Sequence, residues 1–301
     1  MNNNFNLSSI PSLPIITGKY PNNDKGAIGF DTFEIGSLPT AYWQILITSE
    51  DSNRWNNFFD NLSNEKINDK IAHHDIMYYP GMNSTAPFRN YGGPLTHFRA
   101  QYHGFIPLNQ PLIIAGYVAE KYVKRNKTFT TFKLETYTEK GILIQEHWRT
   151  FMLPAVGVDL KGIQIKQTEV FPAVSKKISN NEFGPIRLLC SQDRLTMIEG
   201  DGELTAHTSL EKAKLMGHNK TTAQACISIT KISRLLTKQF GNDFFTNGFI
   251  DIKLIKPTFS GEIMSSYGNI KKETTKEIIC DLKVENTNNE SVTVGIGGIK
   301  K

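Results

Sequence analysis

The sequence contains no run of about eighteen apolar residues, the length that a helix needs to cross a membrane. Its first residues, MNNNFNLSS, form neither a basic start nor an apolar core, so no secretory signal is expected. Lysine and arginine are scattered, and no basic tract is interleaved with aromatic residues. We therefore expect a soluble, cytoplasmic protein without a membrane or nucleic-acid partner, although its net charge of +5 favours anionic partners.

Cysteine is scarce as well. The three cysteines lie far apart, each in an apolar or helical context: Cys190, Cys226 and Cys280. This spacing makes neither a metal cluster nor a disulfide framework, so we expect packed thiols. His73, His74 and Asp75 are adjacent, but their spacing suits no ordinary metal site, and we interpret them as a solvated loop. The sequence predicts no metal site.

What the chain does contain is enough apolar sequence for two ordinary cores, since 39% of its 301 residues are hydrophobic and 10% are aromatic. Residues 1–29 carry many Asn, Pro and Gly and are expected to form an extended arm. Residues 40–47 are typical of a strand, and Ser49 is predicted to cap a helix with Trp55 and Phe59 on one face. Prolines and glycines between residues 76 and 95 exclude a long helix there.

Strict alternation of apolar and polar residues begins at His97. Phe98 and Tyr102 fall on one predicted face, whereas His97 and His103 fall on the other and are expected at the surface. Three further strands are predicted, joined by short turns, at residues 112–124, 128–137 and 142–153. The first half of the chain is therefore a meander of long strands.

The second half repeats this pattern. Residues 47–51 resemble 189–193, residues 98–102 resemble 249–253, and residues 134–144 resemble 282–294, at separations of 142, 151 and 148 residues. Such nearly constant spacing indicates an internal duplication. We predict four segments: an arm 1–29, a first repeat 30–154, a linker 155–185 and a second repeat 186–301.

One stretch of the second repeat concentrates the residues that could carry chemistry. Asp201 and His207 are six positions apart in an irregular segment. Thr208 and Glu211 fit a capping box, which predicts that a short helix starts directly after His207. Further on, ten residues pass without a charge and apolar residues recur at the helical period, so residues 222–240 are predicted to form a helix buried by a sheet.

These residues resemble the MaoC-like dehydratases of the hotdog superfamily, which include the (R)-specific enoyl-CoA hydratases. The elements that match the family motif are Gly200-Asp201, Ala206-His207-Thr208, Ala213, Gly217, Ala223-Gln224-Ala225 and the strand and turn of residues 249–262. The resemblance implies an α+β double hotdog fold. Two antiparallel sheets would be joined side by side, and only the C-terminal repeat would retain the long central helix.

The resemblance also implies a function. Its members are hydro-lyases that reversibly add water to an enoyl thioester, or dehydrate a 3-hydroxyacyl thioester, of coenzyme A or acyl carrier protein in fatty acid metabolism. No metal or organic cofactor is implied. Asp201 and His207 would hold one water, with His207 as base and acid, and a backbone amide at the start of the buried helix, at Ala225 or Gln224, would face the thioester carbonyl.

The motif departs from the family pattern in three ways. Asp201 stands six residues before His207 where the family has five, the Asn-Pro pair of the family is missing, and Ala225 replaces a glycine. Glu203 is an alternative acid if the loop runs differently. The alternative function is a catalytically degenerate hotdog module that binds acyl thioesters, an accessory subunit of a dehydratase, or a thioesterase.

Simpler interpretations accompany these residues. His207 beside a helix start can merely satisfy that helix end, and Asp201 beside glycines is typical of a turn. A basic cluster surrounds one hairpin turn and suits either the phosphates of coenzyme A, an acidic carrier protein, or simple solubility: Lys121, Lys124, Arg125 and Lys127. Homodimerisation is also possible, since one-repeat members of the superfamily form dimers.

Overall fold

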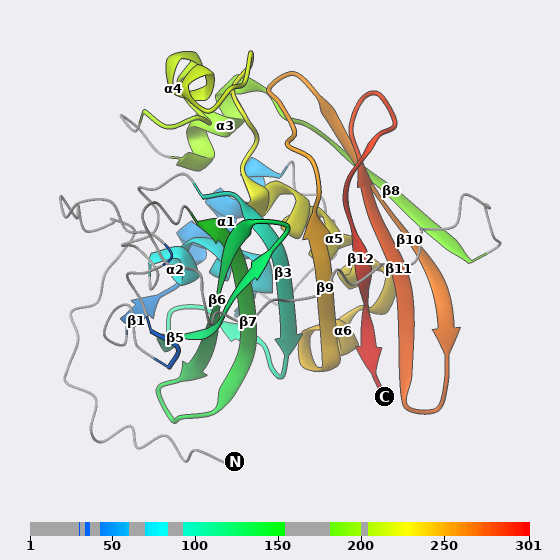
Figure 1. Cartoon of the computed structure of the whole chain (residues 1–301). Helices are drawn as coiled ribbons and strands as arrows, with labels where there is room; N and C mark the ends of the chain where they lie inside the picture. The colour runs from blue at the N-terminus through cyan, green and yellow to red at the C-terminus, as the bar shows by residue number, and fades with distance from the viewer. Residues whose placement is uncertain are drawn as a thin grey trace. The chain divides into compact units, whose positions relative to one another are not determined.

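The computed structural model describes residues 30, 34–36, 43–59, 70–83, 93–153, 181–199 and 204–301 (Figure 1). The predicted arm and residues 155–180 of the predicted linker lie outside this described part. The chain divides into two compact units: unit 1 comprises residues 1–49 and 67–170, and unit 2 comprises residues 50–66 and 171–301.

Unit 1 is built on a five-stranded antiparallel sheet with the order β1-β5-β6-β7-β3. Its elements are β1 (Trp43–Leu46), β2 (Ile71–Ala72), the 3-10 helix η2 (His74–Met77), α2 (Tyr78–Asn83), β3 (Leu95–Tyr102), β4 (Ile106–Pro107), β5 (Pro111–Lys124), β6 (Lys127–Thr138) and β7 (Leu143–Leu153). The short strands β2 and β4 pair separately. The strands predicted from sequence are confirmed, and η2 and α2 are the short helical turns that the prolines and glycines of this region allow.

The long hairpin of β5 and β6 turns at Arg125 and Asn126, whose φ angles are 52° and 56°. Two left-handed residues in succession define the hairpin turn whose twist matches that of the strands. One face of this sheet is buried, and Phe98, Tyr102 and Phe132 lie on it, as the alternation of β3 predicts.

Unit 2 has a second five-stranded antiparallel sheet, with the order β8-β10-β11-β12-β9. Its elements are α1 (Ser49–Phe58, in this unit from Glu50), β8 (Glu182–Leu189), α3 (Gln192–Glu199), α4 (Leu210–Leu215), α5 (Ala225–Phe240), α6 (Asn242–Asn247), β9 (Gly248–Leu254), β10 (Ile263–Glu273), β11 (Glu277–Glu285) and β12 (Ser291–Lys300). Strand β8 starts inside the segment predicted as a linker.

The two units share one strand order. In each, the first strand of the sheet is followed along the chain by a helix, and the sheet then runs first-third-fourth-fifth-second. This is the arrangement expected of an internal duplication. How the two sheets are joined stays a prediction.

Helix α5 forms the centre of unit 2. It packs on β8, β10, β11 and β12, and every side chain from Cys226 to Thr237 is buried (Figure 1). Its apolar period therefore marks a core helix, as predicted. Arg234 is buried as well and donates from Nη2 to Oδ1 of Asn56 in α1, at 2.8 Å.

The thiols are packed as the sequence predicts. Cys190, Cys226 and Cys280 are free and fully buried. Burial raises the pKa of Cys190 and of Cys280 to about 12, so neither thiol is a ready nucleophile. None of the helices in the described ranges combines the length and the apolar character needed to span a membrane.

Candidate active site

His207 lies in the turn between α3 and α4, where contacts with three residues hold it. Its backbone N–H donates to Oγ1 of Thr205 at 3.1 Å, and its carbonyl accepts from Nε2 of Gln192 at 2.9 Å. Its ring atom Nδ1 lies 2.7 Å from the carbonyl oxygen of Thr222 and 3.2 Å from the hydroxyl of the same residue. These contacts with the backbone and with the ring fix the position of His207.

The contact with Thr222 decides which ring nitrogen can act as a base. A carbonyl oxygen only accepts hydrogen bonds, so Nδ1 must carry the proton. In the neutral ring Nε2 is then left with a free lone pair. Within the described part of the chain, Nε2 has no hydrogen-bond partner. The half-buried His207 thus presents a hydrogen-bond acceptor of the kind that a water-activating base requires.

The segment that carries Thr222 is extended and leads directly into α5. Thr222 bridges to Phe259, flanked by a bond from Ser260 N to Thr221 O at 2.9 Å and one from Ala223 N to Thr258 O at 2.7 Å. The predicted strand and turn of residues 249–262 therefore serve to hold this segment in place. His207 is bonded to a residue only three positions before the first residue of α5.

Helix α5 begins at Ala225, with Gln224 as its N-cap residue. The Gln224 side chain does not cap the helix, because its Nε2 donates instead to the carbonyl of Leu195 at 2.8 Å and to Oε2 of Glu199 at 3.2 Å, both in α3. The helix N-terminus is a site of partial positive charge, which favours a developing oxyanion. The structure thus places the predicted amide donors, at Ala225 and Gln224, in the same segment that holds His207.

The two predicted acids are not among the residues that the structure describes. Asp201 and the alternative Glu203 lie outside the described residues, in the gap between α3 and the His207 turn. The pairing of Asp201 with His207 stays a prediction. In the residues that the structure does describe, no group of histidines, cysteines and acids is arranged to hold a metal ion.

Sequence reasoning missed the residues of α3 that tie this site together. Gln192 bonds to the His207 carbonyl through Nε2 and accepts from Oγ1 of Thr221 at 2.5 Å through Oε1. Glu199 is 8% exposed and bonds to Gln224. Nothing in the local sequence marks either residue, because both contacts join segments about 15 to 30 residues apart.

The predicted capping box is wrong. The N-cap of α4 is Ser209, whose hydroxyl accepts from the backbone N–H of Lys212, and the helix starts at Leu210. Thr208 instead accepts a bond from the backbone N–H of Thr205. The Thr208 hydroxyl is therefore used inside the turn that carries His207, and the cap moves one residue on.

The prediction of a solvated loop at residues 73–75 is also wrong. His73, His74 and Asp75 are only 3%, 1% and 3% exposed. His74 stacks on Tyr102 with ring centroids 4.0 Å apart, and its Nδ1 lies 2.8 Å from Oε1 of Gln145. The short 3-10 helix η2 packs these three polar residues against the buried face of the unit 1 sheet. The local sequence gives no sign of this burial.

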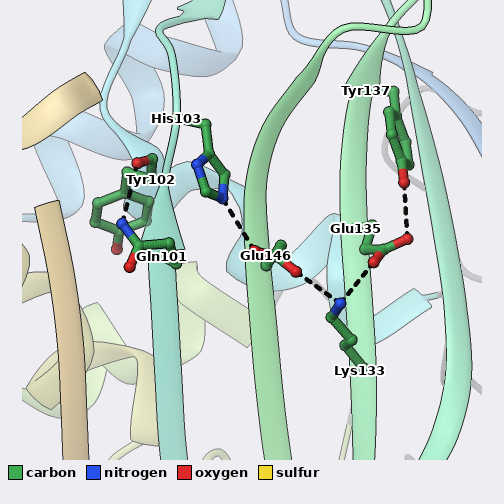
Figure 2. Close-up of polar contacts among 7 residues, drawn as sticks. All are labelled: Gln101, Tyr102, His103, Lys133, Glu135, Tyr137 and Glu146. Carbon is green, nitrogen blue, oxygen red and sulfur yellow. Dashed lines mark hydrogen bonds and ion pairs between the residues drawn. The ribbon is translucent and has the colours of Figure 1, made fainter. Parts of the chain in front are cut away.

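The opposite face of that sheet carries a chain of polar contacts across β3, β7 and β6 (Figure 2). Glu146 lies 3.0 Å from Nε2 of His103 and 2.6 Å from Nζ of Lys133. Lys133 also pairs with Glu135 at 2.7 Å, and Glu135 accepts from the hydroxyl of Tyr137 at 2.8 Å. His103 lies at the surface, as predicted.

Comparison with solved structures shows which fold the chain has. No family model and no curated protein matches the sequence. A MaoC-like dehydratase from Phytophthora capsici has a TM-score of 0.64 and 15% identity, covering 88% of this chain and 96% of its own. A Mycobacterium tuberculosis protein described as having a double hotdog fold has a TM-score of 0.61 and 12% identity, covering 91% and 99%.

The full-length peroxisomal multifunctional enzyme type 2 of Drosophila melanogaster has a TM-score of 0.66 and 14% identity over 86% of this chain. The chain spans 48% of that protein's length. At these sequence identities the similarity shows the fold alone. The chain has the double hotdog fold, and its resemblance to the MaoC-like dehydratases is confirmed at that level.

Proposed function

We propose that the protein is a hydro-lyase that reversibly adds water to an enoyl thioester of coenzyme A or acyl carrier protein. The observation that carries this proposal is the bond from His207 Nδ1 to the Thr222 carbonyl, at 2.7 Å. It leaves Nε2 able to accept a hydrogen bond, on a residue that is bonded to the segment leading into the long buried helix α5. Hydration of an enoyl thioester needs this pair of features, a base for water and a donor for the enolate oxygen.

In the proposed mechanism, His207 Nε2 takes a proton from the bound water while the water oxygen adds to the β-carbon of the substrate. Negative charge moves to the thioester oxygen, which the amide end of α5 at Ala225 or Gln224 stabilises. The proton is then returned to the α-carbon, and Asp201 is the proposed partner of His207 in orienting the water. The reverse sequence dehydrates the 3-hydroxyacyl thioester.

The finer features of the resemblance belong to the same proposal. We infer that the two sheets lie side by side, that only the C-terminal repeat retains the long central helix, and that the absence of its counterpart in the first repeat leaves room for an acyl chain. The repeat boundaries at residues 30–154 and 186–301 and a possible homodimer are proposed with them.

The test measures the hydration of crotonyl-CoA, which is monitored through the loss of the enoyl absorbance. His207→Ala should lower kcat by about 10²–10⁴-fold, the usual contribution of a general base. His218→Ala is the matched control, because His218 lies in the same segment but packs its ring edge-to-face on Phe259, with centroids 5.5 Å apart. No hydration by the wild type at several chain lengths, or equal activity of the two variants, would contradict the proposal.

The second candidate is a thioesterase or a degenerate acyl-thioester binding module. It is favoured by the altered spacing of Asp201 and His207 and by the absence, among the described residues, of a carboxylate bonded to the His207 ring. A thiol-trapping reagent distinguishes these functions in the same reaction vessel. Release of free coenzyme A without loss of the enoyl group would assign a thioesterase, and binding without either reaction would assign a binding module.

A further inference from the structure

Helix α4 (Figure 1) exposes apolar side chains where a helix of a folded protein normally buries them. Ala213 is the buried residue of α4, whereas Leu210 and Leu215, its first and last residues, are 46% and 77% exposed. Leu204 before the helix and Met216 directly after it are 70% and 46% exposed. Apolar side chains are driven out of water, so this helix is reversed with respect to the hydrophobic effect.

We call the exposed side chains of Leu204, Leu210, Leu215 and Met216 the α4 cluster. A six-residue helix is only about 9 Å long, so side chains at its two ends lie within reach of one partner surface. Of the eleven large apolar side chains that are exposed in the described part of the chain, four come from residues 204–216, so they are concentrated and not scattered. Single exposed apolar residues are ordinary, whereas a group of them marks an interaction site.

The α4 cluster belongs to an ordered helix. Ser209 Oγ accepts a backbone N–H of the first turn at 3.4 Å, which caps the start of α4. At the other end Gly217 has φ 81°, its N–H donates to Lys214 O at 2.9 Å, and the N–H of the next residue donates to Ala213 O at 3.0 Å. This pair of bonds around a left-handed glycine is the Schellman motif that commonly ends a helix. The exposed side chains are therefore held in place, as a preformed docking surface requires.

The charge around the α4 cluster is positive. Lys212 and Lys214 lie on α4 and Lys220 follows it, against one acid, Glu211, and all four are exposed. In the part of the chain that the structure describes, none of these three lysines forms an ion pair, whereas three lysines of β10 and β11 pair with acids at 2.9 to 3.0 Å. The α4 cluster therefore suits a partner whose surface is both apolar and acidic.

We propose that α4 is the docking surface for an acidic acyl carrier protein that brings the acyl thioester to His207. This inference rests on the proposed hydro-lyase function and names its substrate, the carrier-bound thioester in preference to the coenzyme A thioester. Coenzyme A supplies phosphates but no protein surface that could cover the leucines of α4. A carrier protein supplies acids and apolar side chains together. Helix α4 starts three residues after His207, a distance of at most about 10 Å along the chain, so a carrier bound there is close to the proposed base.

The experiment compares hydration of a crotonyl group on purified acyl carrier protein and on coenzyme A. Leu215→Ser should raise KM for the carrier-bound substrate about tenfold with kcat unchanged, because docking is the same before and during the reaction. Lys214→Glu should raise this KM about fivefold, an effect that about 0.5 M salt should diminish. KM for crotonyl-CoA should change less than about twofold in both variants.

Matched controls come from exposed residues of unit 2 outside the cluster. Ile255→Ser changes an isoleucine that is 51% exposed, and Lys276→Glu changes an exposed lysine in the turn between β10 and β11. Neither control should alter KM for either substrate. If Leu215→Ser and Lys214→Glu match these controls with the carrier-bound substrate while the wild type hydrates and His207→Ala does not, the docking inference is overturned and the proposed function stands.

Direct binding tests the docking surface even where no hydration occurs. If the wild type hydrates neither thioester, the proposed function fails, and calorimetry with butyryl-loaded carrier protein still decides the inference. A Kd about tenfold weaker for Leu215→Ser than for Ile255→Ser supports docking at α4, and equal Kd values overturn it. Two other occupants would also overturn it in the absence of carrier binding. These are a dimer that Leu215→Ser dissociates in ultracentrifugation and binding to phosphatidylglycerol vesicles that Leu215→Ser abolishes.

Discussion

Replacing the buried Lys231 by methionine should stabilise the protein at neutral and acidic pH. Lys231 is 0% exposed on α5, and its ammonium group donates to the carbonyl of Ile186 in β8 at 2.6 Å. Burial lowers its pKa from 10.5 to about 7. Because one pKa unit corresponds to about 1.4 kcal/mol, keeping the charged form in this place costs about 5 kcal/mol.

Part of this cost is offset by the hydrogen bond, which contributes about 1–2 kcal/mol. The Ile186 carbonyl keeps a second donor, since the Ser266 hydroxyl lies 3.4 Å away, so methionine does not leave it unsatisfied. Methionine also has nearly the shape of the lysine stem and fills irregular cores. We therefore expect Lys231→Met to raise the free energy of unfolding by about 2–4 kcal/mol at pH 6, as replacements of buried charges often do.

The pH dependence gives the sharper test. The folded pKa of Lys231 lies below the unfolded one, so between pH 7 and 10.5 the unfolded state binds the extra proton and wild-type stability rises with pH. The advantage of Lys231→Met should accordingly shrink by about 3 kcal/mol from pH 6 to pH 9.5. Urea unfolding at both pH values measures it, with the exposed Lys238→Met as control. A variant that is less stable at pH 6, or a difference that does not change with pH, would refute the reasoning.

Two further predictions concern acid stability. Burial, with the nearby charge of Arg149, lowers the pKa of His147 well below 6.5, so the unfolded state gains a proton first as pH falls. Below pH 6.5 the free energy of unfolding of the wild type should therefore fall by about 1.4 kcal/mol per pH unit in urea titrations, and His147→Leu should remove this fall. An equal pH dependence of the two proteins would contradict this. The bond to His103 and the ion pair with Lys133 hold the pKa of Glu146 at about 2 against the effect of burial. Glu146→Gln should therefore cost about 1–2 kcal/mol at pH 7, and the difference should diminish as pH falls from 4.5 towards 2. A difference in thermal melts that is as large at pH 2 as at pH 7 would show that the charge is not the cause.

Much of the architecture could be predicted from the sequence, because the decisive signals are local. The alternation around Phe98 marks β3, and the uncharged apolar period after residue 222 marks α5. Periodicity reports which face of an element is buried, and the structure buries the faces it indicates. The resemblance in the second repeat added the fold class, which periodicity alone does not give.

The details of the candidate site were less accessible. The sequence predicts the cap of α4 one residue early, because Thr208 and Ser209 are both good caps and only the turn around Thr205 decides between them. The sequence alone predicts that His73 and Asp75 face solvent, since their burial depends on the sheet beneath them rather than on their neighbours in sequence. Likewise, no sequence pattern could reveal that Gln224 is held by a helix about 30 residues upstream.

Helix α3 reaches both halves of the candidate site: Gln192 at its start holds the His207 turn, while Leu195 and Glu199 further along hold Gln224. A change in the tilt of this one helix would therefore affect the His207 turn and the Gln224 side chain at the same time. Exchanging the residues of this eight-residue helix would therefore alter both halves of the site together.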